Sequence, residues 1–165
     1  MKELIGNILG LAKLKRVAYA DIRIIRRQRE EIGVKNGTVD LLTFDEDFGC
    51  GIRILYQGAW GFACSSRVNK RETEGVFDKA LSIARASSKA KGEVLLPGAF
   101  PSVSRYQTPV SIDPFKVSME TKLRLLLEAD EVLRKNKKVK ISEAFMGSYR
   151  TEKTFASTEG SYIEQ

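Results

Sequence analysis

The chain has 165 residues, of which 42% are hydrophobic and 30% charged, and its 28 Lys and Arg outnumber 21 Asp and Glu to give a net charge of +7. This composition is typical of a soluble globular domain, and no apolar run approaches the ~18 residues that a membrane span needs, so we expect no membrane partner. The sequence contains no histidine, which excludes a Ser-His-Asp triad, a Cys-His pair and the usual zinc protease motif within these residues.

The N-terminal segment and the cysteines bear on where the protein works. Glu3, Asn7 and Lys13 interrupt the first apolar residues, which is not the pattern of a signal peptide. Cys50 and Cys64 are the only cysteines and predict no disulfide framework, so we expect a cytoplasmic protein. Both thiols are expected to pack as small hydrophobic groups on neighbouring strands, since a metal site would need carboxylates or a second chain to complete four ligands.

The first part of the chain changes from helical to strand periodicity. Apolar residues between 2 and 16 recur at helical spacing, whereas residues 18–28 alternate with a period of two. A second strand is predicted at 31–35 and its return at 38–43, because the Asn36-Gly37 pair between them is a strong signal for a type I′ hairpin turn.

Another hairpin is predicted after an acidic turn at residues 45–47. Its strands are expected at 48–56 and 59–63, joined by Gln57 and Gly58. The acidic turn lacks the glycine spacing of a calcium loop, so it is interpreted as solvated rather than as a cation site. Trp60 and Phe62 share one side of their strand, and a core position is preferred for both over ligand stacking.

Helical periodicity returns in the second half. Residues 70–89 predict a helix, and four prolines between 97 and 114 then predict an extended or loop connection over 91–117. Ser118 is a good N-cap for a helix over 119–136.

Strands are expected to close the chain. Alternation begins at Val139, a turn is predicted around 147–150, and a strand over 151–157 follows. Turn residues at 158–161 then lead into a short alternating segment that ends at Gln165. The order of elements predicts an α+β fold in one domain, residues 1–165, with a mostly antiparallel sheet built from hairpins and about three helices packed on one face.

Basic residues are densest between Arg23 and Arg29. On a strand, Arg23, Arg27 and Arg29 share one face and Arg26 lies opposite, so the cluster divides. A solvated face is the favoured interpretation. A contact with a peptide, a carboxylate or a phosphate through Arg23, Arg27 and Arg29 is the alternative.

Several short motifs occur together in the order found in one known family. They are Tyr19-Ala-Asp-Ile-Arg23, Val34-Lys-Asn-Gly37, Gly49-Cys-Gly-Ile-Arg53, Gly58-Ala-Trp-Gly-Phe-Ala63, Asp113-Pro114, Ser157-Thr-Glu-Gly160 and Ile163-Glu-Gln165. In this combination the sequence, from about Ala18 to Gln165, resembles the TldD/PmbA family, whose members were named as modulators of DNA gyrase and are now regarded as zinc metallopeptidases. The residues that carry the likeness most clearly are Asn36, Gly37, Gly49, Gly51, Gly58, Gly61, Glu159 and Gly160.

The resemblance implies the N-terminal, non-catalytic domain of a longer protein. The zinc ligands of the family lie downstream of the matched region, so no catalytic or metal-binding residue is expected in this chain, although zinc is expected in the whole protein. The implied role is to shape the peptide-access chamber or to pair subunits as a homo- or hetero-oligomer, with a sheet edge offered to an unfolded peptide substrate. A basic module that binds nucleic acid or associates with gyrase is the alternative, and its binding would weaken steeply with salt.

Overall fold

The computed structural model describes residues 1–90, 94–98 and 100–165. Its helices are α1 (Lys2–Leu14), α2 (Lys70–Ser87), the 3₁₀ turn η1 (Pro114–Lys116) and α3 (Met119–Arg134). Its strands are β1 (Tyr19–Lys35), β2 (Thr38–Tyr56), β3 (Ala59–Ser65), β4 (Val103–Arg105), β5 (Glu143–Ser157) and β6 (Tyr162–Glu164). Among the described residues no helix is long and apolar enough to cross a membrane.

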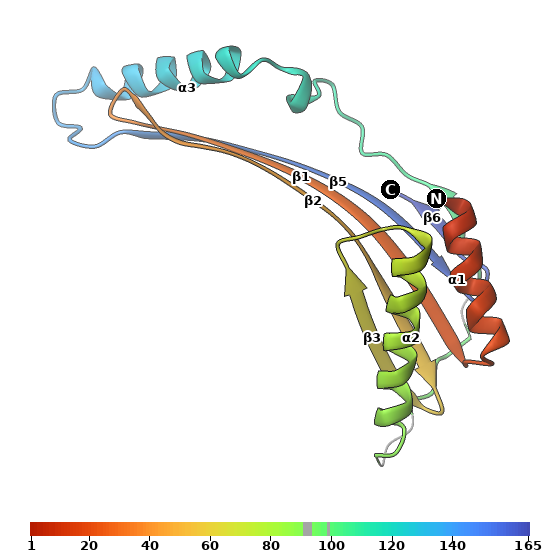
Figure 1. Ribbon diagram of the computed structural model, residues 1–165. Helices are drawn as coiled ribbons and strands as arrows, with labels where there is room; N and C mark the ends of the chain where they lie inside the picture. The colour runs from red at the N-terminus through yellow and green to blue at the C-terminus, as the bar shows by residue number, and fades with distance from the viewer. Residues whose placement is uncertain (91–93, 99) are drawn as a thin grey trace. The chain divides into compact units, whose positions relative to one another are not determined.

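The strands form a six-stranded sheet in the order β3-β2-β1-β5-β6-β4 (Figure 1). β2 pairs antiparallel with β3 and β5 antiparallel with β6, whereas the short β4 runs parallel to β6. Hairpin turns therefore account for most of the pairing, and the prediction of an α+β fold with a mostly antiparallel sheet and three helices is confirmed.

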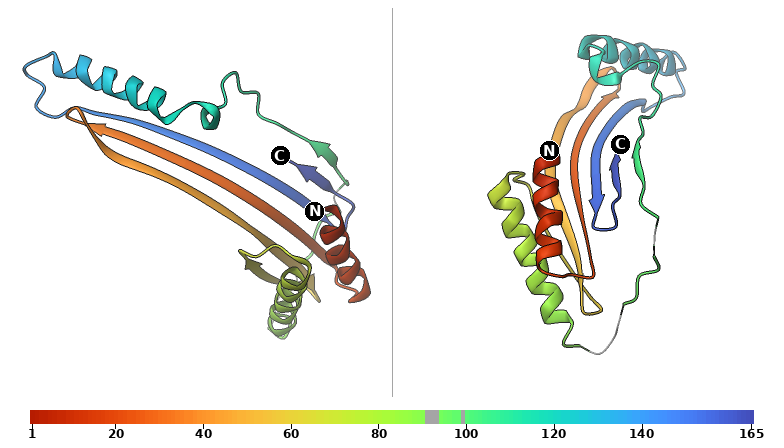
Figure 2. Two further views of the ribbon diagram at one scale, coloured as in Figure 1. Left: turned by 45° about the horizontal axis from the view of Figure 1, so that its top comes forward. Right: turned by 90° about the vertical axis from the view of Figure 1, so that its right-hand side faces the viewer.

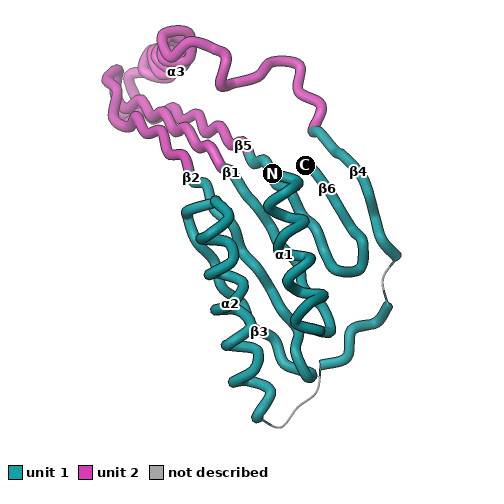
Figure 3. The backbone as a smooth tube through the Cα atoms, turned by 45° about the vertical axis from the view of Figure 1, so that its right-hand side comes forward, with its two compact units in different colours: residues 1–26, 47–107, 151–165 teal, residues 27–46, 108–150 magenta. Residues whose placement is uncertain are grey.

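The chain forms two compact units, and β1, β2 and β5 contribute residues to both (Figure 3). Unit 1 comprises Met1–Arg26, Asp47–Gln107 and Thr151–Gln165. Unit 2 comprises Arg27–Glu46 and Thr108–Arg150. Each unit has its own hydrophobic cluster, so each is described separately below. The expectation of a single domain stays a prediction.

The core of unit 1 lies between the sheet and the helices α1 and α2, which run beside each other (Figure 2). On β3 the side facing α2 carries the small residues Ala59, Gly61 and Ala63, which are buried. A Cβ atom at Gly61 would overlap the carbonyl oxygen of Ala80 and lie 2.5 Å from the backbone nitrogen of Ala84. Because these are backbone atoms of α2, the missing side chain of Gly61 sets how closely the helix approaches the strand.

The core of unit 2 is small and partly charged. Its fully buried apolar residues are Ile32, Val34 and Leu126. On α3 the buried stripe consists of Lys122, Leu126 and Asp130. Two of these three carry a charge, and Leu126 is the apolar member of the stripe.

Both buried charges on α3 have hydrogen-bond partners. Lys122 donates from Nζ to Oε1 of Glu30, and the two side chains are 4% and 10% exposed. Asp130 accepts from the Ser142 hydroxyl at 2.6 Å and from Arg134 Nε at 2.7 Å. The Ser142 hydrogen bond, with Arg134 second, holds the pKa of Asp130 below its usual value. These bonds satisfy groups whose burial would otherwise be costly.

Two hairpin turns and one helix cap agree with prediction. Asn36 and Gly37 have φ of 49° and 82°, as a type I′ turn requires, and Gln57 and Gly58 repeat the pattern with 47° and 74°. The Ser118 hydroxyl accepts from the Thr121 N–H at 3.2 Å, which confirms Ser118 as the N-cap of α3.

The predicted breaks within the long strands are wrong. β1 runs unbroken through Arg29 and Glu30, the acidic residues 45–47 belong to β2 rather than to a turn, and Gly147 to Arg150 lie inside β5. The acidic residues stay exposed while their backbone remains in the strand. β1 keeps its alternation because Glu30, on the buried side, is neutralised by Lys122. Local polarity was mistaken for turn chemistry, although no proline or positive φ interrupts these stretches.

Three smaller predictions also need correction. Trp60 is half-buried and Phe62 is 54% exposed, because both lie on the side of β3 away from α2 rather than in the core. β5 begins at Glu143, whereas the strand was predicted to begin at Val139. The connection predicted over 91–117 contains β4 and η1; within it, residues 91–93 and 99 lie outside the described residues.

Candidate functional site

An ionic cluster occupies the side of β1 and β2 that faces away from α1 and α2 in unit 1. Asp21 is 1% exposed, and its Oδ2 accepts from Arg53 Nε at 2.8 Å and lies 2.6 Å from Arg53 Nη2. Oδ1 of Asp21 has no hydrogen-bond partner among the described residues, and Arg23 Nε lies 3.7 Å from it. The hydrogen bond that Arg53 donates to Asp21 raises the pKa of Arg53. A buried carboxylate thus orients two guanidinium groups.

Aromatic rings surround this cluster. The guanidinium of Arg53 lies 5.2 Å from the ring centre of Trp60, and Trp60 meets Tyr19 edge to face with centroids 5.7 Å apart. Arg23 lies 5.5 Å from the ring centre of Phe155. Burial, followed by the charge of Asp21, raises the pKa of Tyr19 to about 12, so the phenol stays neutral and able to donate at neutral pH. We call these residues, Tyr19, Asp21, Arg23, Arg53, Trp60 and Phe155, the arginine–aromatic cluster.

The arginine–aromatic cluster has chemistry suited to an anion or a peptide carbonyl. The side chains of Arg23 and Arg53 remain 41% and 39% exposed, so N–H groups not used by Asp21 face solvent. Planar guanidinium groups held in place by a carboxylate recognise carboxylates and carbonyl oxygens with little loss of side-chain entropy. Sequence analysis identified Arg23 but missed Arg53 and Asp21, because their pairing depends on the register between β1 and β2.

The other two arginines singled out from the sequence belong to unit 2. Arg29 Nη2 lies 2.5 Å from Glu31 Oε1, which also accepts from the Tyr149 hydroxyl at 3.1 Å. The hydrogen bond from Arg29 lowers the pKa of Glu31. Arg27 is exposed. Arg23, Arg27 and Arg29 are therefore divided between two units, and their role in peptide or anion contact stays a prediction.

The glycine-containing motifs lie at turns and close approaches. Gly160 has a φ of 94° in the turn before β6, and a Cβ at Gly37 would lie 2.7 Å from Arg134 Nη2. A Cβ at Gly49 would lie 2.8 Å from the carbonyl oxygen of Ser65, and one at Gly51 would lie 3.0 Å from the Phe62 ring. With Asn36, Gly58 and Gly61 described above, these positions shape the backbone rather than carry reactive groups.

Glu159 has a different setting from the glycines of its motif. It is half-buried and lines a cavity of about 350 Å³ together with apolar side chains that include Leu55, Val94 and Leu96. Its charge also contributes to the raised pKa of Tyr19, after burial and Asp21.

The two cysteines lie on neighbouring strands, as predicted, but in different surroundings. Cys50 is buried in the core of unit 1, whereas Cys64 is exposed on the opposite side of the sheet, which corrects the expectation that both are packed. Burial raises the pKa of the Cys50 thiol. Among the described residues no group of three or more Cys, Asp or Glu side chains converges as a metal site would require.

We expect the two thiols to differ in reactivity. Iodoacetamide at pH 8 should modify Cys64 rapidly and Cys50 only after denaturation, because attack requires an accessible thiolate. Mass spectrometry of a time course measures this, with Cys64→Ser losing the fast phase and Cys50→Ser retaining it. Equal rates at both thiols would contradict the burial of Cys50.

Comparison with known proteins shows which family this chain resembles. Residues 20–89 match the family model described as PmbA/TldA metallopeptidase domain 1. The fold closely resembles part of a candidate DNA gyrase modulator from Thermotoga maritima, with a TM-score of 0.78 and 21% identity over 99% of this chain and 36% of that one. It also resembles TldE from Thermococcus kodakarensis, with a TM-score of 0.78 and 13% identity over 98% of this chain and 36% of that one.

Sequence relatives agree with this class. A metalloprotease of Methanocaldococcus jannaschii is 28% identical over 96% of this chain and 35% of its own length. A metalloprotease TldD homolog of Haemophilus influenzae is 24% identical over 93% of this chain and 32% of its own length. The chain is thus similar to proteins of the TldD/PmbA family, and its residues 20–89 match the model of the family's first domain. It spans about a third of the length of these curated relatives.

Proposed function

We propose that this chain is the non-catalytic N-terminal domain of a metallopeptidase and that it helps to guide a peptide substrate or to pair subunits. The observation that carries the proposal is the extent of the match, since 96% of this chain aligns with only 35% of a protein named as a metalloprotease. On this proposal, the metal site and the hydrolytic chemistry belong to the remaining two thirds of such a protein.

The residues of this chain do not fit a zinc site. Structural or catalytic zinc needs three or four converging nitrogen, sulfur or oxygen ligands. Cys50 lies in the core and Cys64 on the other side of the sheet, and the sequence has no histidine. We therefore derive no catalytic step from this domain and assign it a binding role.

The arginine–aromatic cluster supports a role in peptide guidance. Exposed N–H groups of Arg23 and Arg53 are suited to donate to peptide carbonyl or carboxylate oxygens, and the half-buried Trp60 beside them offers apolar contact area. A second feature is the outer edge of β2. β3 pairs with β2 only over Cys50–Tyr56, so no strand among the described residues covers the edge of Thr38–Glu46. An uncovered edge is the element to which an extended peptide adds as a strand.

Metal analysis tests the proposal. The purified 165-residue chain, treated with a mild chelator, should retain far less than one zinc per chain, because it lacks a convergent ligand set. A longer protein that includes the downstream part should retain zinc and cleave unstructured peptides. Stoichiometric zinc that survives the chelator in the 165-residue chain, or peptide cleavage by that chain alone, would overturn the proposal.

A further inference from the structure

The part of β2 that belongs to unit 2, residues 38–46, carries exposed apolar side chains on the side that α3 occupies. A Cβ at Gly33 would lie 3.1 Å from Leu41 Cβ, so Leu41 shares the side of Gly33 on the neighbouring strand. Because side chains alternate along a strand, Leu42 and Phe44 lie on the opposite side, with Ile32 and Val34 of the unit 2 core. Yet Leu42 is 53% and Phe44 is 58% exposed, so α3 covers β1 but does not extend over this part of β2.

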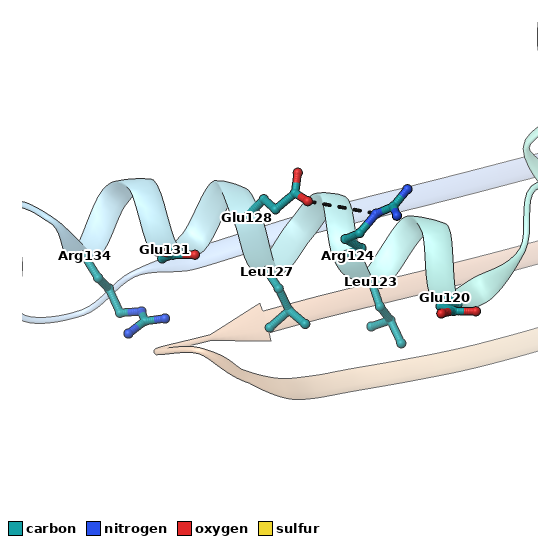
Figure 4. A pocket seen from close by; sticks show the side chains of 7 residues that line it. All are labelled: Glu120, Leu123, Arg124, Leu127, Glu128, Glu131 and Arg134. Carbon is teal, nitrogen blue, oxygen red and sulfur yellow. Dashed lines mark ion pairs between the residues drawn. The ribbon is translucent and has the colours of Figure 1, made fainter.

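A groove follows the flank of α3 in the same unit. It has a volume of about 710 Å³ and is lined by Leu123 and Leu127 together with charged residues of the helix. Figure 4 shows both leucine side chains extending from α3 towards the β1–β2 hairpin, whereas Glu128 points away from it. Apolar contact area is thus supplied by Leu123 and Leu127 from the helix and by Leu42 and Phe44 from the sheet. We call this surface the α3 groove.

The rim of the α3 groove carries an excess of unpaired negative charge. The lining includes Glu120, Glu128 and Glu131 against Arg124 and Arg134. Both arginines are already engaged, since Arg124 lies 3.9 Å from Glu128 and Arg134 binds Asp130. Glu120 and Glu131 have no ion pair among the described residues. The rim is therefore acidic, although the whole chain has a net charge of +7.

We propose that the α3 groove is a docking site for an amphipathic segment of a partner protein that has leucine-like residues on one side and lysine or arginine on the other. Apolar side chains of the segment pack on Leu42, Phe44, Leu123 and Leu127, and its basic residues lie against Glu120 and Glu131. Burial of the four apolar groups supplies affinity, and the acidic rim supplies orientation and selectivity.

Charge argues against a second copy of this chain as the occupant. A two-fold contact brings the same surface of both copies together. Two α3 grooves in contact would place Glu120 and Glu131 of one copy near the same acidic residues of the other, which is repulsive. A basic partner satisfies the charge that a second copy leaves unpaired. This proposal goes beyond the role assigned to the domain above and does not depend on it.

The test uses two fluorescein-labelled helical peptides of equal length, with leucines at i, i+3, i+4 and i+7. One carries lysine on its polar side and the other glutamate. Fluorescence anisotropy should show binding of the lysine peptide at least about tenfold tighter than that of the glutamate peptide. Charge reversal with Glu120→Lys and Glu131→Lys should weaken binding of the lysine peptide and strengthen binding of the glutamate peptide.

A pair of matched variants locates the site. Leu42→Ser should weaken binding of the lysine peptide about tenfold, because it removes a central apolar contact. Val39→Ser is the control, since Val39 is similarly exposed at 48% but lies on the other side of β2. Circular dichroism confirms that both variants fold. The proposal is overturned if the lysine peptide does not bind, if both serine variants weaken it equally, or if sedimentation shows a dimer that Leu42→Ser dissociates.

Discussion

Replacing Gly61 with alanine is expected to lower the free energy of unfolding by about 3 kcal/mol. The new methyl group would overlap the carbonyl oxygen of Ala80 and lie 2.5 Å from the backbone nitrogen of Ala84. These are backbone atoms of a regular helix, so the clash cannot be relieved by a change of rotamer and α2 would have to move away from β3. Urea unfolding followed by far-ultraviolet circular dichroism measures the loss.

Gly75→Ala is the matched control for this substitution. Gly75 lies within α2, and no atom outside the local helix backbone is within 4 Å of a Cβ placed there. Alanine in a helix interior is more favourable than glycine by about 0.5–1 kcal/mol, so this variant should gain stability. A Gly61→Ala protein as stable as the unchanged chain would show that α2 does not pack on β3 at the observed distance.

The second large effect is expected when Lys122 is replaced by methionine. Lys122 and Glu30 are both buried, and removal of the ammonium leaves the Glu30 carboxylate without its partner. Loss of one member of a buried ion pair costs about 3–5 kcal/mol. The local stability of α3 should fall accordingly. Amide hydrogen exchange in α3 and in residues 27–35 of β1 should therefore become faster, and this is the measurement that checks the prediction.

Two controls separate this effect from a general loss of charge. Arg124→Met removes another cation from α3, but its pair with Glu128 is exposed and should contribute less than about 0.5 kcal/mol. The double variant Lys122→Met with Glu30→Leu removes both charges and should recover most of the loss, because no unpaired ion remains. An equal effect of Lys122→Met and Arg124→Met would mean that the Lys122–Glu30 pair is not buried in solution.

Local chemistry was sufficient to predict two of the hairpin turns and the α-helices. Asn36-Gly37 and Gln57-Gly58 set positive φ within a few residues, and Ser118 caps α3 through its own side chain. The buried face of α2, including Phe77 and Ala80, follows directly from its 3.6-residue period. These features need no knowledge of distant parts of the chain.

Long-range pairing explains what the sequence could not predict. Residues 45–47 resemble a turn in isolation but remain in a strand because β2 continues its pairing past them. In the sequence Asp130 looks like an exposed residue, because its hydrogen bond with Ser142 forms only in the folded chain. The same limit applies to the candidate site, since Asp21 and Arg53 are 32 residues apart and meet only through sheet register. Trp60 was assigned to the wrong side because the small residues that face α2 give no hydrophobic signal.

The position of Trp60 has a consequence for optical spectroscopy. It is the only tryptophan of the chain, and it lies against Tyr19 and Arg53 in unit 1. Emission excited at the red edge of indole absorption therefore reports on unit 1 and contains no signal from unit 2. A melting curve recorded by this emission follows one half of the protein, whereas ellipticity from all three α-helices follows both. Separation of the two curves would reveal the order in which the units unfold, without a label or a substitution.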